Sequence, residues 1–334
     1  MRAATLRTHA RSQVVVSAMG LGCAQMGNLY RVMTHAEAFG AFDAAREAGL
    51  RYFDTAPFQG FTRSERRLGT LLTDLPRDGF ALSTKVGRLM RPDPTIGEEE
   101  DGYVMPLPFR PVYDYTHDGV MRAFEDSQQR LGIPCPDILY VHDIGRVTHG
   151  DRHAVYWEQL TAGGGFDALA RLRSEGSVKA IGLGVNEWEI IAAAIEVADL
   201  DICLLAGRYT LLEQDSLALM DDCARRGIGL VLAGAFNSGI LAGGGQYNYR
   251  AAPEDITARV AALRSACSEA GVSLQAAALQ FPLAHPAALS VVVGAHDAAQ
   301  VRTNVAWFEE SIPPGFWGGL KARGLIAEAV PVPA

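Results

Sequence analysis

The feature that most constrains the fold is a regular alternation of short apolar runs with longer segments of helical periodicity. The short runs are bounded by polar or glycine-containing turns, a pattern that predicts buried parallel strands. The eight predicted strands are Ala18–Cys23, Tyr52–Thr55, Ala81–Lys85, Ile138–His142, Ala180–Gly184, Ile202–Leu205, Gly229–Ala233 and Ser290–Val293. The predicted helices between them are His35–Ala48, Gly119–Leu131, Phe166–Ser174, Glu187–Ala198, Ser216–Arg226, Pro253–Ala270 and Ala298–Phe308.

Eight strand–helix units without a flexible linker favour an α/β fold of one kind, a closed (β/α)₈ TIM barrel, over an open doubly wound sheet. We therefore expect one domain over residues 1–334, which is longer than a typical barrel of roughly 250 residues. The extra length falls in the proline-rich segment 87–115, a predicted lid loop after the third strand, and in a C-terminal tail of about 308–334. That tail is expected across the barrel mouth or against its side.

Local signals mark where the helices begin and end. Ser64 followed by Glu65, and Asn186 followed by Glu187, predict helix starts at strand-to-helix junctions. Left-handed caps after helices are predicted at Gly49, Gly132, Gly176, Gly227 and Gly271.

Composition excludes several classes of function. The formal net charge of −8 argues against a nucleic-acid partner or an anionic membrane surface, and no apolar stretch approaches 18 residues. The start of the chain lacks the pattern of a signal peptide, so we expect a cytoplasmic protein with a small-molecule substrate. The five cysteines form no CxxC pair, and His149 and His153 lie in a predicted solvated loop, so no metal site is expected.

Ionisable residues end three consecutive predicted strands. Asp54, Lys85 and His142 would meet at the carboxyl end of a barrel, where such folds build their sites. Lysine is rare here, with three lysines among 30 basic residues, and an Asp–Lys pair at the mouth would keep both groups charged. The alternative is that each residue is a lone polar group at a strand end.

Five segments together resemble one family. They are similar to the motifs of aldo-keto reductases and occur in the family's order. The segments are FDTAPFQGFTRSERRLG, STKVG, LYVHDIG, GSVKAIGLGVNEWE and FNSGIL. The resemblance spans about residues 14–325 and is nearest to the aldose 1-dehydrogenase branch. That branch includes dehydrogenases acting on L-fucose, L-galactose, D-threo-aldoses and pyridoxal. It implies NAD(P)-dependent oxidation of an aldose at C1 to the lactone, or reduction of a carbonyl.

The resemblance implies a catalytic set with one departure. Asp54, Lys85 and His142 match the family's Asp, Lys and His, but Gln59 stands at the position of the proton-donating Tyr. A glutamine amide donates or accepts hydrogen bonds and has no proton to transfer near neutral pH. Three explanations remain open. Gln59 is an introduced replacement; or it is natural, with His142 or a water taking the proton; or the barrel binds cofactor without turnover or uses it transiently in a lyase or isomerase.

The phosphates of a dinucleotide are expected near the loop after the seventh strand, because barrels place phosphate sites there. Small residues and backbone N–H groups in FNSGIL suit a pyrophosphate; the alternative is a glycine-rich surface turn. The cofactor-binding residues predicted here are Phe236, Asn237, Ser238, Gly239 and Leu241, with Gly22 and Cys23 at the end of the first strand.

The resemblance assigns the two ends of the dinucleotide. Asn186 would hold the nicotinamide carboxamide, and the adenosine would lie against Gly294, His296, Gln300 and Asn304. The Lys, Ser and Arg that usually bind a 2′-phosphate are missing, with Arg302 the nearest fixed positive charge. This favours NAD(H) over NADP(H).

Aromatic residues near the predicted mouth are candidates for substrate contacts. Tyr30, Phe58 and Tyr113 would pack against the C–H faces of a sugar; packing within the core or lid is the alternative. The oligomeric state cannot be inferred from the sequence.

Overall fold

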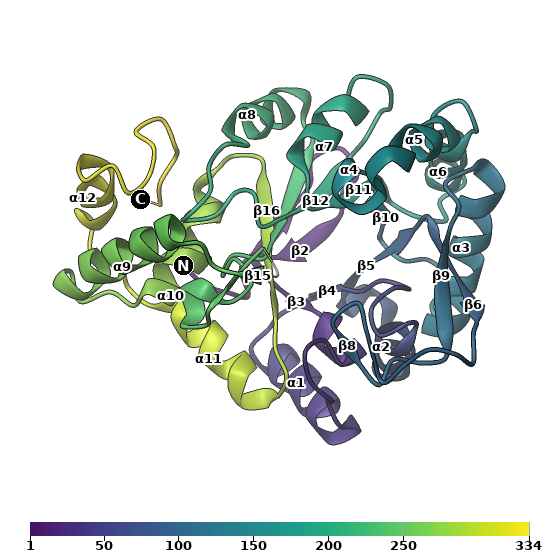
Figure 1. Ribbon diagram of the computed structural model, residues 1–334, viewed down its shortest axis with the longest axis horizontal. Coiled ribbons are helices and arrows are strands. Elements are labelled where there is room, and N and C mark those ends of the chain that lie inside the picture. Colours follow the sequence, from purple (N-terminus) through teal and green to yellow (C-terminus); the bar gives the residue numbers. More distant parts are fainter. Residues whose placement is uncertain (249, 334) are drawn as a thin grey trace.

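The chain forms a closed barrel of eight parallel strands ringed by helices, in a computed structural model that describes residues 1–248 and 250–333 (Figure 1). Around the barrel, each strand pairs with its neighbours in chain order and β16 closes the ring onto β3. The barrel strands are β3 Met19–Gly22, β4 Tyr52–Asp54, β5 Ala81–Val86, β10 Ile138–His142, β11 Ala180–Val185, β12 Ile202–Ala206, β13 Gly229–Ala233 and β16 Ala288–Gly294. The prediction of a (β/α)₈ barrel is confirmed.

The helices on the outside bury one face against the strands. They are α1 His35–Glu47, α2 Arg63–Leu72, α3 His117–Leu131, α4 Arg146–His149, α5 His153–Leu160, α6 Gly165–Ser174, α7 Trp188–Ala194, α8 Leu217–Arg226, α9 Glu254–Glu269, α10 Leu274–Gln280, α11 Ala298–Glu309 and α12 Phe316–Ala322. Short 3₁₀ turns lie at η1 Ala24–Gly27, η2 Arg77–Gly79, η3 Gly150–Arg152, η4 Ile240–Ala242 and η5 Phe281–Ala284. All five predicted glycine caps adopt positive φ, between 64° and 78°.

Helices begin at both predicted junctions, within two residues of the predicted starts, but neither Ser64 nor Asn186 caps its helix. α2 begins at Arg63 after a left-handed Thr62, and Ser64 is buried inside the helix with its hydroxyl on the carbonyl of Cys23. α7 begins at Trp188 without a side-chain cap, because the Glu187 carboxylate accepts the N–H groups of Arg146 and Val147 at the start of α4 instead. The helix predicted to Ala198 also ends earlier, at Ala194.

A hairpin covers the amino-terminal end of the barrel. β1 Leu6–Thr8 and β2 Val15–Ser17 pair antiparallel. Val14 and Val16 are buried against the barrel's interior residues, including Tyr52 and Tyr140. This hairpin closes the end of the barrel opposite the carboxyl ends of its strands.

The segment predicted as a loop over residues 87–115 contains two small antiparallel pairs. β6 Arg88–Pro92 pairs with β9 Phe109–Tyr113, and β7 Glu99–Glu100 with β8 Tyr103–Val104. The first pair stands beside α3 (Figure 1). The second reaches the loop after β3, where Tyr103 bridges to Leu29. The lid is therefore a folded structure that touches both sides of the mouth.

The tail packs on the flank of the barrel. α12 lies next to α9 at the left of Figure 1, and the Phe281 and Trp317 rings are 6.2 Å apart. Among the described residues, none beyond Trp307 lines the mouth. No helix in the described part of the chain is long and apolar enough to cross a membrane.

Candidate active site

A cavity of about 890 Å³ opens at the carboxyl ends of the barrel strands. Its size is typical of sites for small molecules and cofactors. The structure gathers in its wall most of the residues that the sequence singled out: Gly22, Tyr30, Asp54, Phe58, Gln59, Lys85, His142, Asn186, Phe236, Asn237, Ser238, Gly239, Gly294, His296, Gln300 and Asn304.

Three of the predicted site residues lie elsewhere among the described residues. Cys23 and Leu241 are fully buried in the hydrophobic core, and burial raises the pKa of the Cys23 thiol, so this thiol is protonated. Tyr113 packs behind the cavity wall, its ring 4.6 Å from the His149 ring. None of the three residues lines the cavity.

Asp54 and Lys85 form a buried ion pair at the floor of the cavity. The Lys85 ammonium lies 2.8 Å from each oxygen of the Asp54 carboxylate and 2.9 Å from the Thr55 carbonyl. Ser83 donates a further hydrogen bond of 2.6 Å to Asp54 Oδ1. All three N–H groups of Lys85 therefore have acceptors, and both charges are compensated where burial alone would neutralise them.

Gln59 is fixed beside this pair by a tightly packed loop. A Cβ on Gly60, whose φ is +66°, would lie 2.2 Å from the Gly27 carbonyl oxygen. The Gln59 side-chain oxygen lies 3.3 Å from the Ser64 hydroxyl. The backbone around Gln59 thus sets its position closely, and the side chain offers hydrogen bonds but no transferable proton.

His142 ends β10, and its ring contacts the next residue in the chain. Its Nε2 lies 3.3 Å from Oδ2 of Asp143, and that same oxygen is paired with the buried Arg88 guanidinium. The other carboxylate oxygen accepts from the Asn186 amide at 3.3 Å. Asp143 also lines the cavity. It therefore joins the predicted catalytic histidine to the predicted carboxamide-binding asparagine.

The buried positive charges control ionisation in this part of the site. Burial lowers the pKa of His142 well below its usual value, and Arg88 and Lys85 lower it further, so His142 is neutral at pH 7. Burial raises the pKa of Asp143, and the positive charges of Arg88 and Lys85 oppose that rise. Desolvation of each group is the largest cause.

Tyr115 supports the backbone of His142 from behind. Its hydroxyl donates to the His142 carbonyl oxygen at 2.8 Å, and His149 Nε2 lies 2.9 Å from the same hydroxyl. Because the phenol has one hydrogen, the N–H of His149 is the donor in the second contact. No role in the site was predicted for Arg88, Asp143, Tyr115 or His149, although Arg88 directly follows the motif STKVG and Asp143 lies within LYVHDIG.

The loop after β13 forms a concave turn at the other side of the cavity. Asn237, Ser238 and Gly239 all have positive φ, and successive residues of this kind make anion-binding hollows. The N–H groups of Asn237 and Gly239 are bonded within the turn, and the Phe236 and Trp307 rings lie 6.1 Å apart. Trp307 also lines the cavity.

The polar groups of the wall fit a nicotinamide dinucleotide. Two buried side-chain oxygens of lining residues, on Gln25 and Asn237, have no hydrogen-bond partner among the described residues. Buried polar atoms of this kind are normally paired, so a polar ligand is the natural partner. The residues that would hold the dinucleotide are Gln25, Asn186, the 236–239 turn and Asn304.

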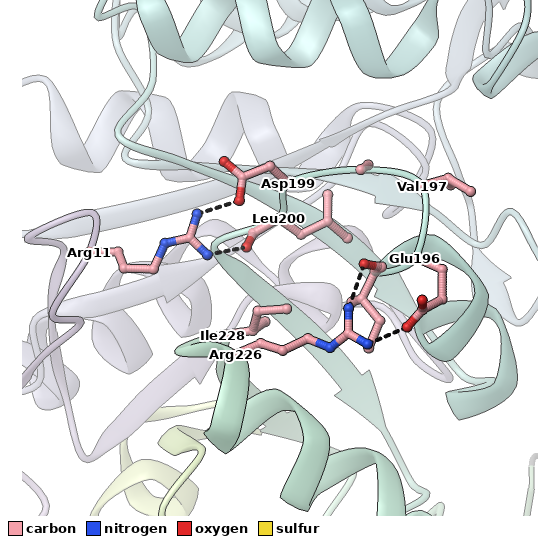
Figure 2. Close-up of a pocket in the computed structure, with 9 residues that line it drawn as sticks. Arg11, Glu196, Val197, Asp199, Leu200, Arg226 and Ile228 are labelled. Atoms are coloured by element: carbon pink, nitrogen blue, oxygen red, sulfur yellow. Dashed lines mark hydrogen bonds and ion pairs between the residues drawn. The ribbon is translucent and has the colours of Figure 1, made fainter.

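Metal binding finds no support in the described residues, which contain no cluster of three or more suitable ligands. A second pocket of about 410 Å³ lies at the opposite end of the barrel, next to the amino ends of β12 and β13. Figure 2 shows Arg11 bonded to Asp199 and Leu200, and Arg226 bonded to Glu196. Arg226 also donates to the Ile195 carbonyl. Contacts at this end of a barrel serve stability.

The fold and the mouth residues define a barrel oxidoreductase with a buried Lys–Asp pair. Residues 18–322 match the model described as the Aldo/keto reductase family, and the chain belongs to that family. It is therefore an NAD(P)-dependent oxidoreductase.

Relatives of known name extend this comparison. The chain is 49% identical over 341 residues to pyridoxal 4-dehydrogenase from Microbacterium luteolum, covering 98% of this chain and 99% of that protein. It is 38% identical over 327 residues to D-threo-aldose 1-dehydrogenase from Pseudomonas sp, covering 95% of this chain and 97% of that protein. The holo form of the aldo-keto reductase AKR11C1 from Bacillus halodurans has the same fold, with a TM-score of 0.73 at 21% identity over 98% and 97% of the two chains.

Proposed function

We propose that the protein oxidises the hydroxyl of a cyclic hemiacetal to a lactone with NAD⁺. The observation that carries the proposal is the Lys85–Asp54 pair beside His142 in a cavity large enough for a dinucleotide and a small substrate. Aldoses close to cyclic hemiacetals, and pyridoxal does so through its neighbouring hydroxymethyl group. The names of the two relatives thus point to one type of reacting group.

Each mouth residue has a role in this reaction. When bound, the dinucleotide supplies the acceptor for the hydride that leaves the substrate carbon. Neutral His142 lies in the cavity wall and positions the substrate oxygen. The Lys85 charge stabilises negative charge that develops on that oxygen. Gln59 contributes a hydrogen bond. Tyr30 and Phe58 supply apolar surface for the substrate ring.

The adenosine end supports a preference for NAD⁺. Among the described residues that line the cavity, Lys85 is the only lysine and there is no arginine. Arg302 points away and pairs with Glu47, while the start of α11 is capped by the Asp297 carboxylate. A 2′-phosphate would meet no arginine or lysine in the described cavity wall there, since the nearby Arg31 lies 4.0 Å from the Asp297 carboxylate and pairs with it. We expect at least tenfold higher kcat/KM with NAD⁺ than with NADP⁺.

Absorbance of the reduced cofactor tests the proposal. The purified protein is incubated with NAD⁺ and a panel containing L-fucose, L-galactose, a D-threo-aldose and pyridoxal, and lactones are sought by mass spectrometry. Steady NADH formation with a matching lactone is expected. Product without net NADH would instead indicate transient use of the cofactor. If neither forms although NADH quenches the protein's tryptophan fluorescence, the chain is a binding module.

A further inference from the structure

Oxidation of a hydroxyl releases a proton, and the residue that usually accepts it in this family is replaced by Gln59. Lys85 cannot take this role, because its three N–H groups are directed at Asp54 and the Thr55 carbonyl. His142 Nε2 lies 3.3 Å from Asp143 Oδ2, and next to an ionised carboxylate this nitrogen carries its hydrogen. The lone pair of the neutral ring is then on Nδ1, which is buried and therefore not accessible to the substrate.

Asp143 is the remaining base in the wall next to His142. Its side chain is 15% exposed, so substrate and water can reach the carboxylate from the cavity. One oxygen contacts Arg88 and His142, and the other accepts from Asn186 at 3.3 Å. A carboxylate has about four lone-pair directions, which leaves capacity for one more donor.

We propose that the Asp143 carboxylate is the general base of this site, a role that rests on the dehydrogenase function proposed above. The C–H bond of the hemiacetal carbon breaks and its electron pair leaves as hydride to NAD⁺. The O–H bond breaks, its proton passes to Asp143, and its electron pair forms the lactone C=O bond. Asp143 then releases the proton to water in the cavity, which balances the reaction as lactone, NADH and H⁺.

The surroundings hold Asp143 in place for this role. Its backbone φ is +41°, a left-handed conformation that aspartate tolerates better than most residues, and its N–H donates to the Gly184 carbonyl at 3.0 Å. The Arg88 guanidinium that pairs with it is itself buried and stacks 4.1 Å from the centre of the Phe58 ring. Tyr115 bonds the neighbouring carbonyl of His142.

The pKa of Asp143 is raised above the ordinary value of aspartate by burial, in spite of the positive charges around it. Burial raises the pKa of Asp143, and the facing cations Arg88 on β6 and Lys85 on β5 act against this rise. The other facing groups are His142 on β10, neutral at pH 7, and the uncharged Asn186 and Tyr115. A base with a raised pKa accepts a proton more readily at neutral pH.

The test is the pH profile of Asp143→Asn, a replacement of the same shape that also tolerates positive φ. Wild-type kcat/KM for oxidation should rise about tenfold per pH unit on an acidic limb and then level off. Asp143→Asn should lose that limb, and its kcat should fall roughly 10²- to 10³-fold. Rates are taken immediately after brief pH jumps, so that slow unfolding does not enter.

Asp201 supplies a matched control. It is another buried aspartate paired with arginines, Arg173 and Arg11, but it lies at the amino-terminal end of the barrel. Asp201→Asn should lower thermal stability and keep the acidic limb. A readout other than turnover shows that the cavity is intact: Asp143→Asn should bind NADH, followed by tryptophan fluorescence, within about threefold of wild type.

A second variant separates proton acceptance from a structural role. Asp143→Gly relieves the positive φ and leaves space next to Arg88 for a small carboxylate. Added formate should raise the kcat of Asp143→Gly at least tenfold, while chloride should leave it unchanged.

The outcomes distinguish the two proposals. If wild type makes NADH and Asp143→Asn retains the acidic limb with kcat within threefold, Asp143 is not the base and the dehydrogenase function stands. Absence of formate rescue in an Asp143→Gly protein that still binds NADH would also overturn the assignment. If wild type makes no NADH with any substrate, the proposed function fails and the assignment fails with it.

Discussion

Lys85 and Asp54 depend on each other, because each charge is buried and has the other as its main partner. Lys85→Met leaves an unpaired buried carboxylate, and we expect a loss of about 3–5 kcal/mol in the free energy of unfolding. Urea denaturation measures this loss. The double variant Asp54→Asn/Lys85→Met should recover most of it. Lys179→Met is the control, since this side chain is 60% exposed and its ion pair with Asp137 should contribute about 1 kcal/mol or less.

Gln59 marks a position where a phenol would add a transferable proton next to Lys85. Gln59→Tyr should raise kcat for oxidation about tenfold. Positioned acid–base groups contribute on the order of 10²–10⁴-fold. The expected gain is smaller because, in our proposal, Asp143 already accepts the proton. The gain should be larger in the Asp143→Asn background. Gln59→Phe adds the ring without the hydroxyl, so equal rates for the Tyr and Phe variants would show that the phenol does not act in proton transfer.

The predicted residues that the structure brings together in one cavity are those whose position is fixed by a strand end. Asp54, Lys85 and His142 follow apolar runs, and a barrel brings such positions together. Arg88 and Asp143 were missed because their pairing spans 55 positions in the chain and depends on how the lid hairpin folds back. No local pattern encodes such a contact.

Among the elements, the loop between β4 and α2 is under the tightest steric control. Gly60 combines a φ of +66° with contact against the backbone of Gly27, so any side chain there is strained and displaces Gln59. Gly60→Ala should lower the free energy of unfolding by about 2 kcal/mol or more and reduce turnover. Denaturant midpoints and steady-state rates measure the two effects.

Gly315→Ala is the matched control for that loop. Gly315 has a negative φ of −81°, and a Cβ there meets no atom within 4 Å. Its stability should stay within about 0.5 kcal/mol of wild type. If Gly60→Ala and Gly315→Ala lower the free energy of unfolding equally, the loss at Gly60 comes from the general effect of replacing a glycine. It would then not come from the contact with Gly27.

Helix ranges were predictable where one face is apolar, whereas for α2, which buries charged side chains, only a start was predicted. α2 buries Glu65 against Thr84 and Arg130, and Arg67 against the carbonyls of Met26 and Met33. These charged residues hide the helix from a search for apolar periodicity. The three-residue strands β1 and β2 are too short to give a period at all.

At the scale of the whole molecule, closure of the barrel follows from the number of strand–helix units, but the position of the tail does not. Phe316, Trp317 and Leu320 bury themselves in the main core next to α9. The sequence allowed the tail to lie either across the mouth or against the side of the barrel, because a short amphipathic helix can pack in either place. The side is occupied, so the mouth is bounded by the lid and the loops after β3 and β13.

The folded protein keeps histidines neutral, and this makes its stability depend on acid. Burial lowers the pKa of His149 to about 4, from an ordinary value of 6.5, and nearby Arg88, His153 and Arg152 lower it further. Burial also lowers the pKa of His142 and His285. Between pH 6.5 and 4, the unfolded chain binds protons that the folded chain does not, so stability is complete above pH 6.5 and is lost as the pH falls through this window.

His149→Gln isolates one part of this effect and keeps a side-chain N–H donor for Tyr115. On acidification from pH 6.5 to 4, the free energy of unfolding should fall by about 1–3 kcal/mol less in the variant than in wild type. The reason is that each pKa unit corresponds to about 1.4 kcal/mol. Urea midpoints at half-unit pH steps measure the slope. Above pH 7 the difference between the two proteins should be constant, because neither form of the chain then protonates this position. Parallel curves across the whole acidic range would show that His149 takes up a proton in the folded protein as readily as in the unfolded chain, and its burial would then not contribute to acid sensitivity.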